Sequence, residues 1–162
     1  MTPDGYTFRP MSVEDLPMVG DWLAAPHVAA WWGDPYEQLA LITEDLGHPA
    51  MDQFIIMERE APLGYLQCYT PTAWNAGFGP QPDCTRGIDL FIGWAEMIDR
   101  GHGSILIRAF VDSIFATGTP RAVTDPDPGN HRALRVYEKA GFRKDRLVET
   151  PDGRALLMVR DA

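Results

Sequence analysis

One predicted helix in the C-terminal third of the chain constrains the fold more than any other feature. Asn130 is a favourable N-cap, and small or apolar residues recur after it at three- and four-residue spacing: Ala133, Leu134, Tyr137 and Ala140. Gly141 follows directly, and glycine tolerates the left-handed conformation in which many helices end. The pattern predicts a helix over 130–140 and fixes the helix face that carries Tyr137.

A glycine-rich turn precedes this helix in the chain. It lies between an apolar run from Ile88 to Gly93 and a helical pattern over 105–115. The free N–H groups and the positive dipole end at a helix start can hold an anion. The turn therefore predicts a diphosphate site, with a simple tight turn as the alternative, formed by Arg100, Gly101, His102, Gly103 and Ser104.

The other segments alternate between strand-like and helical patterns. Strands are expected at 6–11, 54–58, 63–69, 88–93, 121–124, 142–148 and 155–159. Two more helices are expected at 16–23 and 36–46, and Pro26, Gly33 and Pro35 are expected to break the chain around Trp31 and Trp32. We therefore expect an α+β fold in one domain over 1–162, with a central mixed, mostly antiparallel sheet and helices on both faces.

The segment from Thr70 to Thr85 is rich in proline and glycine, so no regular element is expected there. Its length and composition favour a flexible loop or a functional flap. Trp74 and Phe78 are expected either to pack this loop down or to face a ligand.

The size and net charge of the chain limit the classes of partner that it is expected to bind. A chain of 162 residues that is 45% hydrophobic and 23% charged is large enough to bury the core of one domain. The formal net charge of −9 and the pI near 4.7 argue against nucleic acid and against an anionic membrane surface. They suit a cationic or neutral small partner, and solubility is the other explanation of the acidity.

The cysteines and the N-terminal residues indicate the cellular compartment of the protein. Cys68 and Cys84 match neither a disulfide framework nor a zinc site, so free thiols and no metal are expected. The N-terminal residues resemble no signal peptide, and no window approaches the ~20 apolar residues of a membrane span. We expect a cytoplasmic protein.

The order of elements and the offsets of Asn130, Ala133, Tyr137 and the pair Gly141-Phe142 resemble the acetyl-coenzyme A (acetyl-CoA) binding half of the GNAT acetyltransferase superfamily. The turn resembles the superfamily's Q/R-x-x-G-x-G/A loop without its leading Gln or Arg. Arg100 can supply the missing positive charge, whereas Asp99 beside a diphosphate is unfavourable.

This resemblance implies which residues hold acetyl-CoA. The backbone of Phe91, Ile92 and Gly93 would pair with the pantetheine arm, and Asn130 would hydrogen-bond to it. Gly93 would allow a close approach, although a glycine that merely ends a strand is the alternative.

Amine acetylation needs a base, an oxyanion donor and an acid for the departing thiolate. Asp89, on the central strand, is the candidate base, with a buried structural carboxylate as the alternative. Tyr137 is the candidate acid, with a core ring as the alternative, and a backbone N–H near Ile92 is the candidate oxyanion donor. His27 and His131 are expected to have no catalytic role.

A closer resemblance, to aminoglycoside 6′-N-acetyltransferases, covers nearly the whole chain. It is carried by the segments 27–33, 64–67, 86–89, 124–126, 137–142 and 150–153. It implies that Trp32 walls the acceptor pocket, unless it only packs in the core, and that Gln67 hydrogen-bonds acceptor or cofactor. It also implies that three carboxylates bind substrate amino groups: Asp89, Asp125 and Asp152.

This sequence departs from that family at several positions, so other acceptor substrates are retained as alternatives. The family's acidic, Trp-rich loop retains here only Trp74 and Asp83, and Pro49 stands where relatives place a substrate-binding acid. The alternatives are a hydroxylysine-type siderophore precursor, a polyamine, a protein amine, or a non-catalytic acyl-CoA-binding module. The protein is expected to be a monomer or a homodimer.

Overall fold

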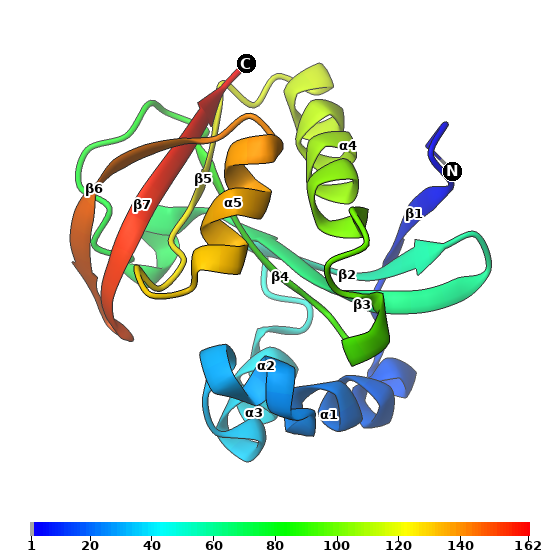
Figure 1. Ribbon diagram of the computed structural model, residues 1–162. Helices are drawn as coiled ribbons and strands as arrows, with labels where there is room; N and C mark the ends of the chain where they lie inside the picture. Colours follow the sequence, from blue (N-terminus) through cyan, green and yellow to red (C-terminus); the bar gives the residue numbers. More distant parts are fainter. Residues whose placement is uncertain (1) are drawn as a thin grey trace. The chain divides into compact units, whose positions relative to one another are not determined.

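The computed structural model describes residues 2–162, and its ribbon is shown in Figure 1. Three short 3-10 turns accompany the regular elements, at Val13–Asp15, Pro71–Trp74 and Ala95–Met97. The helices and strands follow in the order β1 (Tyr6–Pro10), α1 (Leu16–Ala24), α2 (Pro26–Trp32), α3 (Pro35–Asp45), β2 (Met51–Glu58), β3 (Ala61–Tyr69), β4 (Arg86–Ile92), α4 (His102–Ala116), β5 (Arg121–Thr124), α5 (His131–Lys139), β6 (Arg143–Thr150) and β7 (Gly153–Asp161).

The strands form one mixed sheet in the order β1-β2-β3-β4-β5-β7-β6. β4 and β5 run parallel, whereas β1 with β2, β5 with β7, and β6 with β7 pair antiparallel. The expected α+β fold with a mixed, mostly antiparallel sheet is confirmed.

Helix α2 is the one place where the expected element order is wrong. Pro26 was expected to break the chain, but it occupies the first position of α2, and Gly33 ends the helix at a positive φ of 95°. Proline suits a first helical turn because its fixed φ is helical and the N–H that it lacks would have no helical partner there. Trp31 and Trp32 are therefore the last residues of a helix rather than part of a break.

The chain divides into two compact units, and each is described by itself. The first unit runs to Cys68 and resumes from Leu90 to His102. Aromatic rings fill its core: Trp22 packs edge-on against Phe91, with ring centroids 6.2 Å apart, and Tyr65 lies 5.6 Å from Phe91. Burial of these large rings stabilises this unit.

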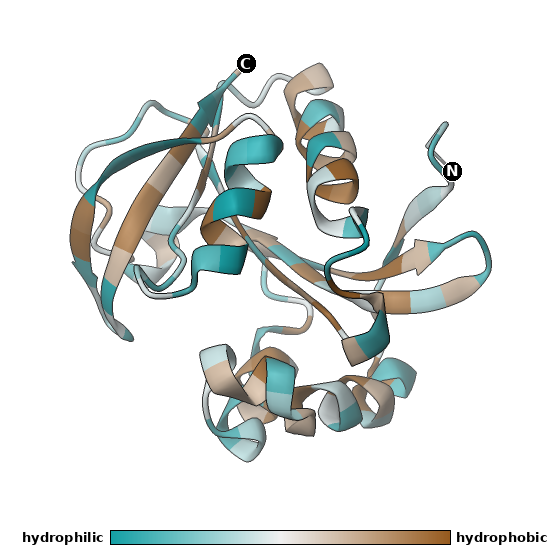
Figure 2. Cartoon of the chain, viewed as in Figure 1, coloured by the Kyte–Doolittle hydropathy of each residue, from teal (hydrophilic) through white to brown (hydrophobic). Residues whose placement is uncertain are grey.

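The second unit holds Tyr69–Asp89 and Gly103–Ala162. Helix α5 buries Leu134 and Tyr137 and exposes its charged residues, which appear as teal turns in Figure 2. Its N-terminus is capped as predicted, because the side-chain oxygen of Asn130 accepts from Ala133 N at 3.2 Å. Gly141 ends the helix at a φ of 98°, so both predicted ends of this helix are confirmed.

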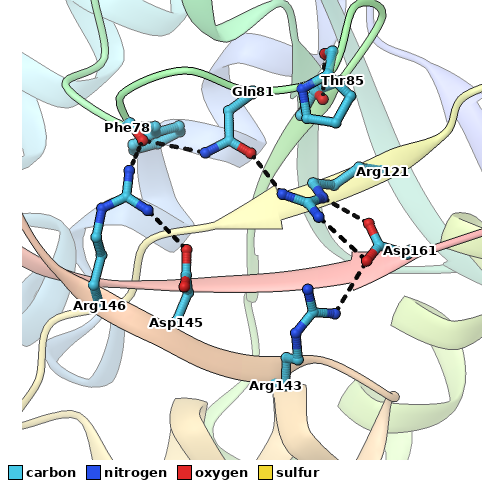
Figure 3. Close-up of polar contacts among 9 residues, drawn as sticks. Phe78, Gln81, Thr85, Arg121, Arg143, Asp145, Arg146 and Asp161 are labelled. Carbon is cyan, nitrogen blue, oxygen red and sulfur yellow. Dashed lines mark hydrogen bonds and ion pairs between the residues drawn. The ribbon is translucent and has the colours of Figure 1, made fainter.

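The loop over 70–85 belongs to the second unit, and polar contacts hold it against β5 and β6 (Figure 3). The Arg146 guanidinium donates to the carbonyl oxygen of Phe78, which also accepts from Gln81 Nε2 at 3.1 Å. Gln81 Oε1 in turn accepts from Arg121 Nη1 at 3.1 Å. Phe78 is only 3% exposed. Its side chain therefore packs the loop down rather than facing a ligand.

Replacement of Arg146 with Met is expected to loosen this loop. The variant loses the hydrogen bond to Phe78 O, and a lost hydrogen bond costs about 1 kcal/mol, or about 5-fold in a local opening equilibrium. Amide hydrogen exchange over 76–82 should therefore accelerate by about 5-fold.

Arg143→Met is the matched control, because Arg143 bonds Asp161 at 3.2 Å and belongs to β6 as well. Equal loop exchange in both variants would contradict this role of Arg146.

Candidate active site

Three carboxylates from separate segments meet in the second unit. Asp89 lies on β4, Asp125 directly follows β5, and Asp152 lies in the turn between β6 and β7. The parallel register pairs Gly87 with Val123, and continuing it by two residues brings Asp89 beside Asp125. The side chains of Asp125 and Asp89 are hydrogen-bonded, and the charge of Asp152 also acts on Asp125.

The local backbone explains why Asp152 and Asp125 are held here. Thr150 pairs with Gly153, so β6 and β7 join through a two-residue turn that contains Asp152. The Thr150 hydroxyl donates to Gly153 O at 2.7 Å and accepts from Asp152 N at 3.2 Å. Leu156 N donates to Pro126 O at 2.9 Å, which ties the segment after Asp125 to β7.

The surroundings of Asp125 favour its protonated form. Burial, followed by the negative charge of Asp89, raises the pKa of Asp125 well above its ordinary value of 3.8. Asp125 is therefore the member of this pair that favours its protonated form, and the negative charge that acts on it belongs to Asp89. A charged, partly desolvated carboxylate beside a neutral acid is suited to binding an ammonium group and accepting its proton.

The raised pKa predicts how folding stability depends on pH. Above about pH 4 the unfolded chain releases the Asp125 proton while the folded chain retains it, so this carboxyl destabilises the fold increasingly as pH rises toward its folded pKa. Asp125→Asn removes that penalty and keeps a donor for Asp89. The gain in Tm over wild type should grow by about 2 °C or more per pH unit from pH 5 to 8.

Differential scanning fluorimetry at these pH values measures this effect. Asp83→Asn is the control, because it makes the same change at an exposed position of the 70–85 loop. A constant Tm difference for Asp125→Asn would show that Asp125 is ionised in the folded protein.

Tyr137 belongs to the second unit as well, and its ring is packed in the core; its role as the acid remains a prediction. Its ring packs edge-on against Phe142, with centroids 5.5 Å apart, and only 7% of the residue is exposed. Burial raises the pKa of the Tyr137 phenol, so the hydroxyl remains protonated and able to donate.

Trp32 and Gln67 belong to the first unit. The Trp32 ring packs edge-on against Phe91 at 5.1 Å and against Tyr65 at 6.2 Å, and it remains half-buried. Gln67 Oε1 accepts from the Tyr65 hydroxyl at 2.8 Å. Both side chains are thus fixed by the same aromatic cluster, and their contact with an acceptor remains a prediction.

The end of β4 carries contacts that the sequence did not reveal. His27 Nε2 donates to Ile92 O at 2.8 Å, so this nitrogen is not available as a base. Gly93 N donates to Leu63 O at 2.8 Å. A side chain at Gly93 would collide with the Trp22 ring, 2.4 Å from its Cβ, so packing within the protein already requires this glycine.

The glycine turn leads directly into α4. Gly101 has a φ of 82° and open space around it, and α4 begins at His102 rather than near 105, so Gly103 and Ser104 lie in its first turn. His102 Nδ1 is hydrogen-bonded to the Tyr6 hydroxyl at 2.7 Å, a contact that no sequence pattern indicated. An exposed turn with free space, next to helix N–H groups and Arg100, fits a diphosphate.

The described residues contain no group of three side chains that could hold a metal ion. Within the same residues, no helix is long and apolar enough to cross a membrane.

Comparison with known proteins places these features in a family. A sequence profile of the acetyltransferase (GNAT) domain matches residues 12–150. The chain belongs to the GNAT acetyltransferase family. The resemblance inferred from Asn130, Tyr137 and the glycine turn is thus confirmed.

Individual GNAT relatives cover almost the whole chain. An aminoglycoside N(6′)-acetyltransferase type 1 from Klebsiella pneumoniae is 35% identical over 97% of this chain and 83% of its own. The lysine N-acyltransferase MbtK of Mycolicibacterium paratuberculosis is 30% identical over 97% of this chain and 74% of its own. A structure of AAC(6′)-Ib in complex with paromomycin and acetyl-CoA has a TM-score of 0.88 and 34% identity, covering 98% of this chain and 94% of the other.

Proposed function

We propose that this GNAT acetyltransferase moves the acetyl group of acetyl-CoA to the 6′-amino group of an aminoglycoside. The observation that carries the proposal is the convergence of Asp89, Asp125 and Asp152 from three segments. Such a cluster suits a polycationic sugar, because its negative charge attracts several ammonium groups. The N(6′)-acetyltransferase relative and the acetyl-CoA-bound AAC(6′)-Ib structure support the same substrates.

Asp89 is the proposed base. Bound acetyl-CoA supplies an activated thioester, and the attacking amine must lose a proton to become a nucleophile. Asp89 carries the negative charge of the hydrogen-bonded pair with Asp125, so it can bind the ammonium and accept this proton. Asp125 and Asp152 then orient the remaining amino groups.

Tyr137 is the proposed acid, because burial keeps its phenol protonated. A backbone N–H near Ile92 is the proposed oxyanion donor. We further propose that the backbone of Phe91, Ile92 and Gly93 and the side chain of Asn130 hold the pantetheine arm, and that residues 100–104 hold the diphosphate.

The remaining proposals concern the protein as a whole. We propose a single domain over 1–162 that acts in the cytoplasm as a monomer or homodimer. The substrate is a small cationic amine rather than nucleic acid or a membrane, in keeping with the net charge of −9.

Thiol release from acetyl-CoA tests the proposal. The purified protein is assayed with 6′-amino aminoglycosides, with a 6′-hydroxyl aminoglycoside as control, and with polyamines and hydroxamate precursors. Turnover confined to the 6′-amino compounds is the expected result. Turnover with another amine alone would exclude the aminoglycoside function but retain acetyl transfer.

A second candidate function is acylation of a lysine- or hydroxylysine-type siderophore precursor. The 30% identity to a lysine N-acyltransferase over 97% of this chain supports it. The 70–85 loop, which retains Trp74 and Asp83 as its only tryptophan and acid, also favours an acceptor with fewer positive charges. The effect of Asp125 and Asp152 variants on turnover separates the two candidate functions, because an acceptor with one amine needs only Asp89. Polyamine or protein-amine acetylation and a silent acyl-CoA-binding module are further outcomes of the same assay.

A further inference from the structure

A chain of three polar side chains runs through the first unit and ends at Gln67. Gln53 lies on β2, whereas Tyr65 and Gln67 lie two residues apart on β3 and therefore share a face of that strand. Gln53 Nε2 donates to the Tyr65 hydroxyl oxygen at 3.2 Å, and that hydroxyl donates to Gln67 Oε1 at 2.8 Å. Gln53 is 7% exposed and Tyr65 is fully buried, so the first two members of the chain are shielded from water.

The backbone of α3 fixes the direction of these hydrogen bonds. Gln53 Nε2 also donates to Ile42 O at 2.9 Å, and a carbonyl oxygen can only accept. The Gln53 amide therefore cannot be turned round, and its nitrogen must face both Ile42 O and Tyr65. In this orientation Gln53 Oε1 is buried with no hydrogen-bond partner among the described residues. A buried acceptor without a partner costs stability, so the needs of Gln53 itself do not explain the arrangement.

Tyr65 transmits this direction to Gln67. Its hydroxyl accepts from Gln53 and has one proton, which it donates to Gln67 Oε1. Its ring packs against Trp32 and Phe91, which holds the hydroxyl in place. The nitrogen of the Gln67 amide is then on the arm opposite to Tyr65. Without Gln53, the Tyr65 hydroxyl could accept from Gln67 Nε2 instead, and both orientations of the Gln67 amide would be allowed.

We infer that Gln53 is a positioning residue that acts through Tyr65 and holds the Gln67 amide so that it offers N–H donors to a ligand. The ligand atom is then an oxygen with a lone pair, either a hydroxyl or ring oxygen of the sugar or a carbonyl oxygen of the pantetheine arm. It is not an ammonium group, which has no lone pair to accept with. This inference rests on the proposed acetyl transfer, for which Gln67 is predicted to contact acceptor or cofactor.

A purely structural Gln53 would only bond the end of α3, because Ile42 lies in the last turn of that helix. Loss of the Gln53 amide would then lower stability, but its effect on KM would not depend on Gln67. Tyr65→Phe separates the two roles. It breaks the chain at the hydroxyl and leaves the bond between Gln53 and Ile42 O in place.

Steady-state kinetics compares Gln53→Met, Tyr65→Phe and Gln67→Met. Gln67→Met is expected to raise KM by about 10-fold and the other two by about 3-fold, with kcat within about 2-fold of wild type. In a Gln67→Met background, neither of the other changes should raise KM further. Tyr65→Phe carries this test alone if Gln53→Met does not fold. Unchanged KM values in Tyr65→Phe, or an equal rise in both backgrounds, would overturn the inference.

The substrate whose KM rises identifies the source of the oxygen. A rise confined to the amine acceptor assigns the oxygen to the sugar, and a rise confined to acetyl-CoA assigns it to the pantetheine arm. Either result supports the donor role of Gln67.

A measurement on ligand-free protein separates this inference from the proposed function. Nuclear Overhauser contacts between the Tyr65 ring and the side-chain NH2 protons of Gln67 report the orientation of the amide. They should be weak in wild type, where Gln67 Oε1 faces Tyr65, and strong in Gln53→Met, where the amide can turn. Strong contacts in wild type, or equal contacts in both proteins, would overturn the inference even if the protein acetylates aminoglycosides. The expected change in a protein without turnover would support the positioning role of Gln53 and reject the proposed function.

Discussion

Replacement of Asp89 with Asn should lower kcat/KM for amine acetylation by about 100-fold or more, the range expected for loss of a general base. The amide retains the shape and can still hydrogen-bond, but it neither carries charge nor accepts the ammonium proton. Affinity for acetyl-CoA should remain within about 2-fold of wild type, because the proposed cofactor contacts lie on other residues. Steady-state kinetics over pH 6–9 combined with calorimetric titration of coenzyme A measures both effects.

Asp152→Asn is the matched control for this loss. Asp152 is exposed in the β6–β7 turn, so its removal should raise KM for a polycationic acceptor several-fold and leave kcat nearly unchanged. Equal losses in both variants would assign Asp89 to substrate binding rather than proton transfer. Turnover by the Asp89 variant at the wild-type rate would show that water or another group is the base.

The sequence predicted best where one segment determined its own structure. The cap at Asn130 and the helix end at Gly141 both follow from spacing within a single helix. Pro26 shows how one residue can mislead, because proline ends one helix and starts another equally well.

Contacts between distant segments were only partly predictable. The meeting of Asp89 and Asp125 could be expected once their strands were identified, since neighbouring parallel strands end at the same sheet edge. No comparable pattern pairs His27 with Ile92 O or Tyr6 with His102. Each of these bonds joins residues more than sixty positions apart, and only the fold brings their side chains into reach.

Close approach of backbones is another property that spacing does not show, and Gly64 is the position where it has the largest effect. An added Cβ there would lie 2.1 Å from Phe91 O and 3.1 Å from Ile92 Cα, which are backbone atoms. A rotamer change cannot relieve this collision, so β4 must move at Phe91. Gly64→Ala should therefore destabilise the fold by about 3 kcal/mol or more, the upper end of overpacking costs, and lower Tm by roughly 6–12 °C.

Gly20→Ala provides the comparison for Gly64→Ala. Its Cβ would lie 3.1 Å from Leu39 Cδ2, the end of a flexible side chain, and alanine is favoured over glycine within a helix such as α1 by about 1 kcal/mol. Its Tm should stay within about 2 °C of wild type.

Because Gly64 faces the stretch of β4 proposed to pair with pantetheine, Gly64→Ala should also weaken coenzyme A binding, measured at a temperature where the variant is folded. A Gly64→Ala protein as stable as wild type would show that β3 and β4 can separate at Phe91 without cost, and unchanged coenzyme A affinity in that variant would remove Phe91 and Ile92 from the proposed cofactor site.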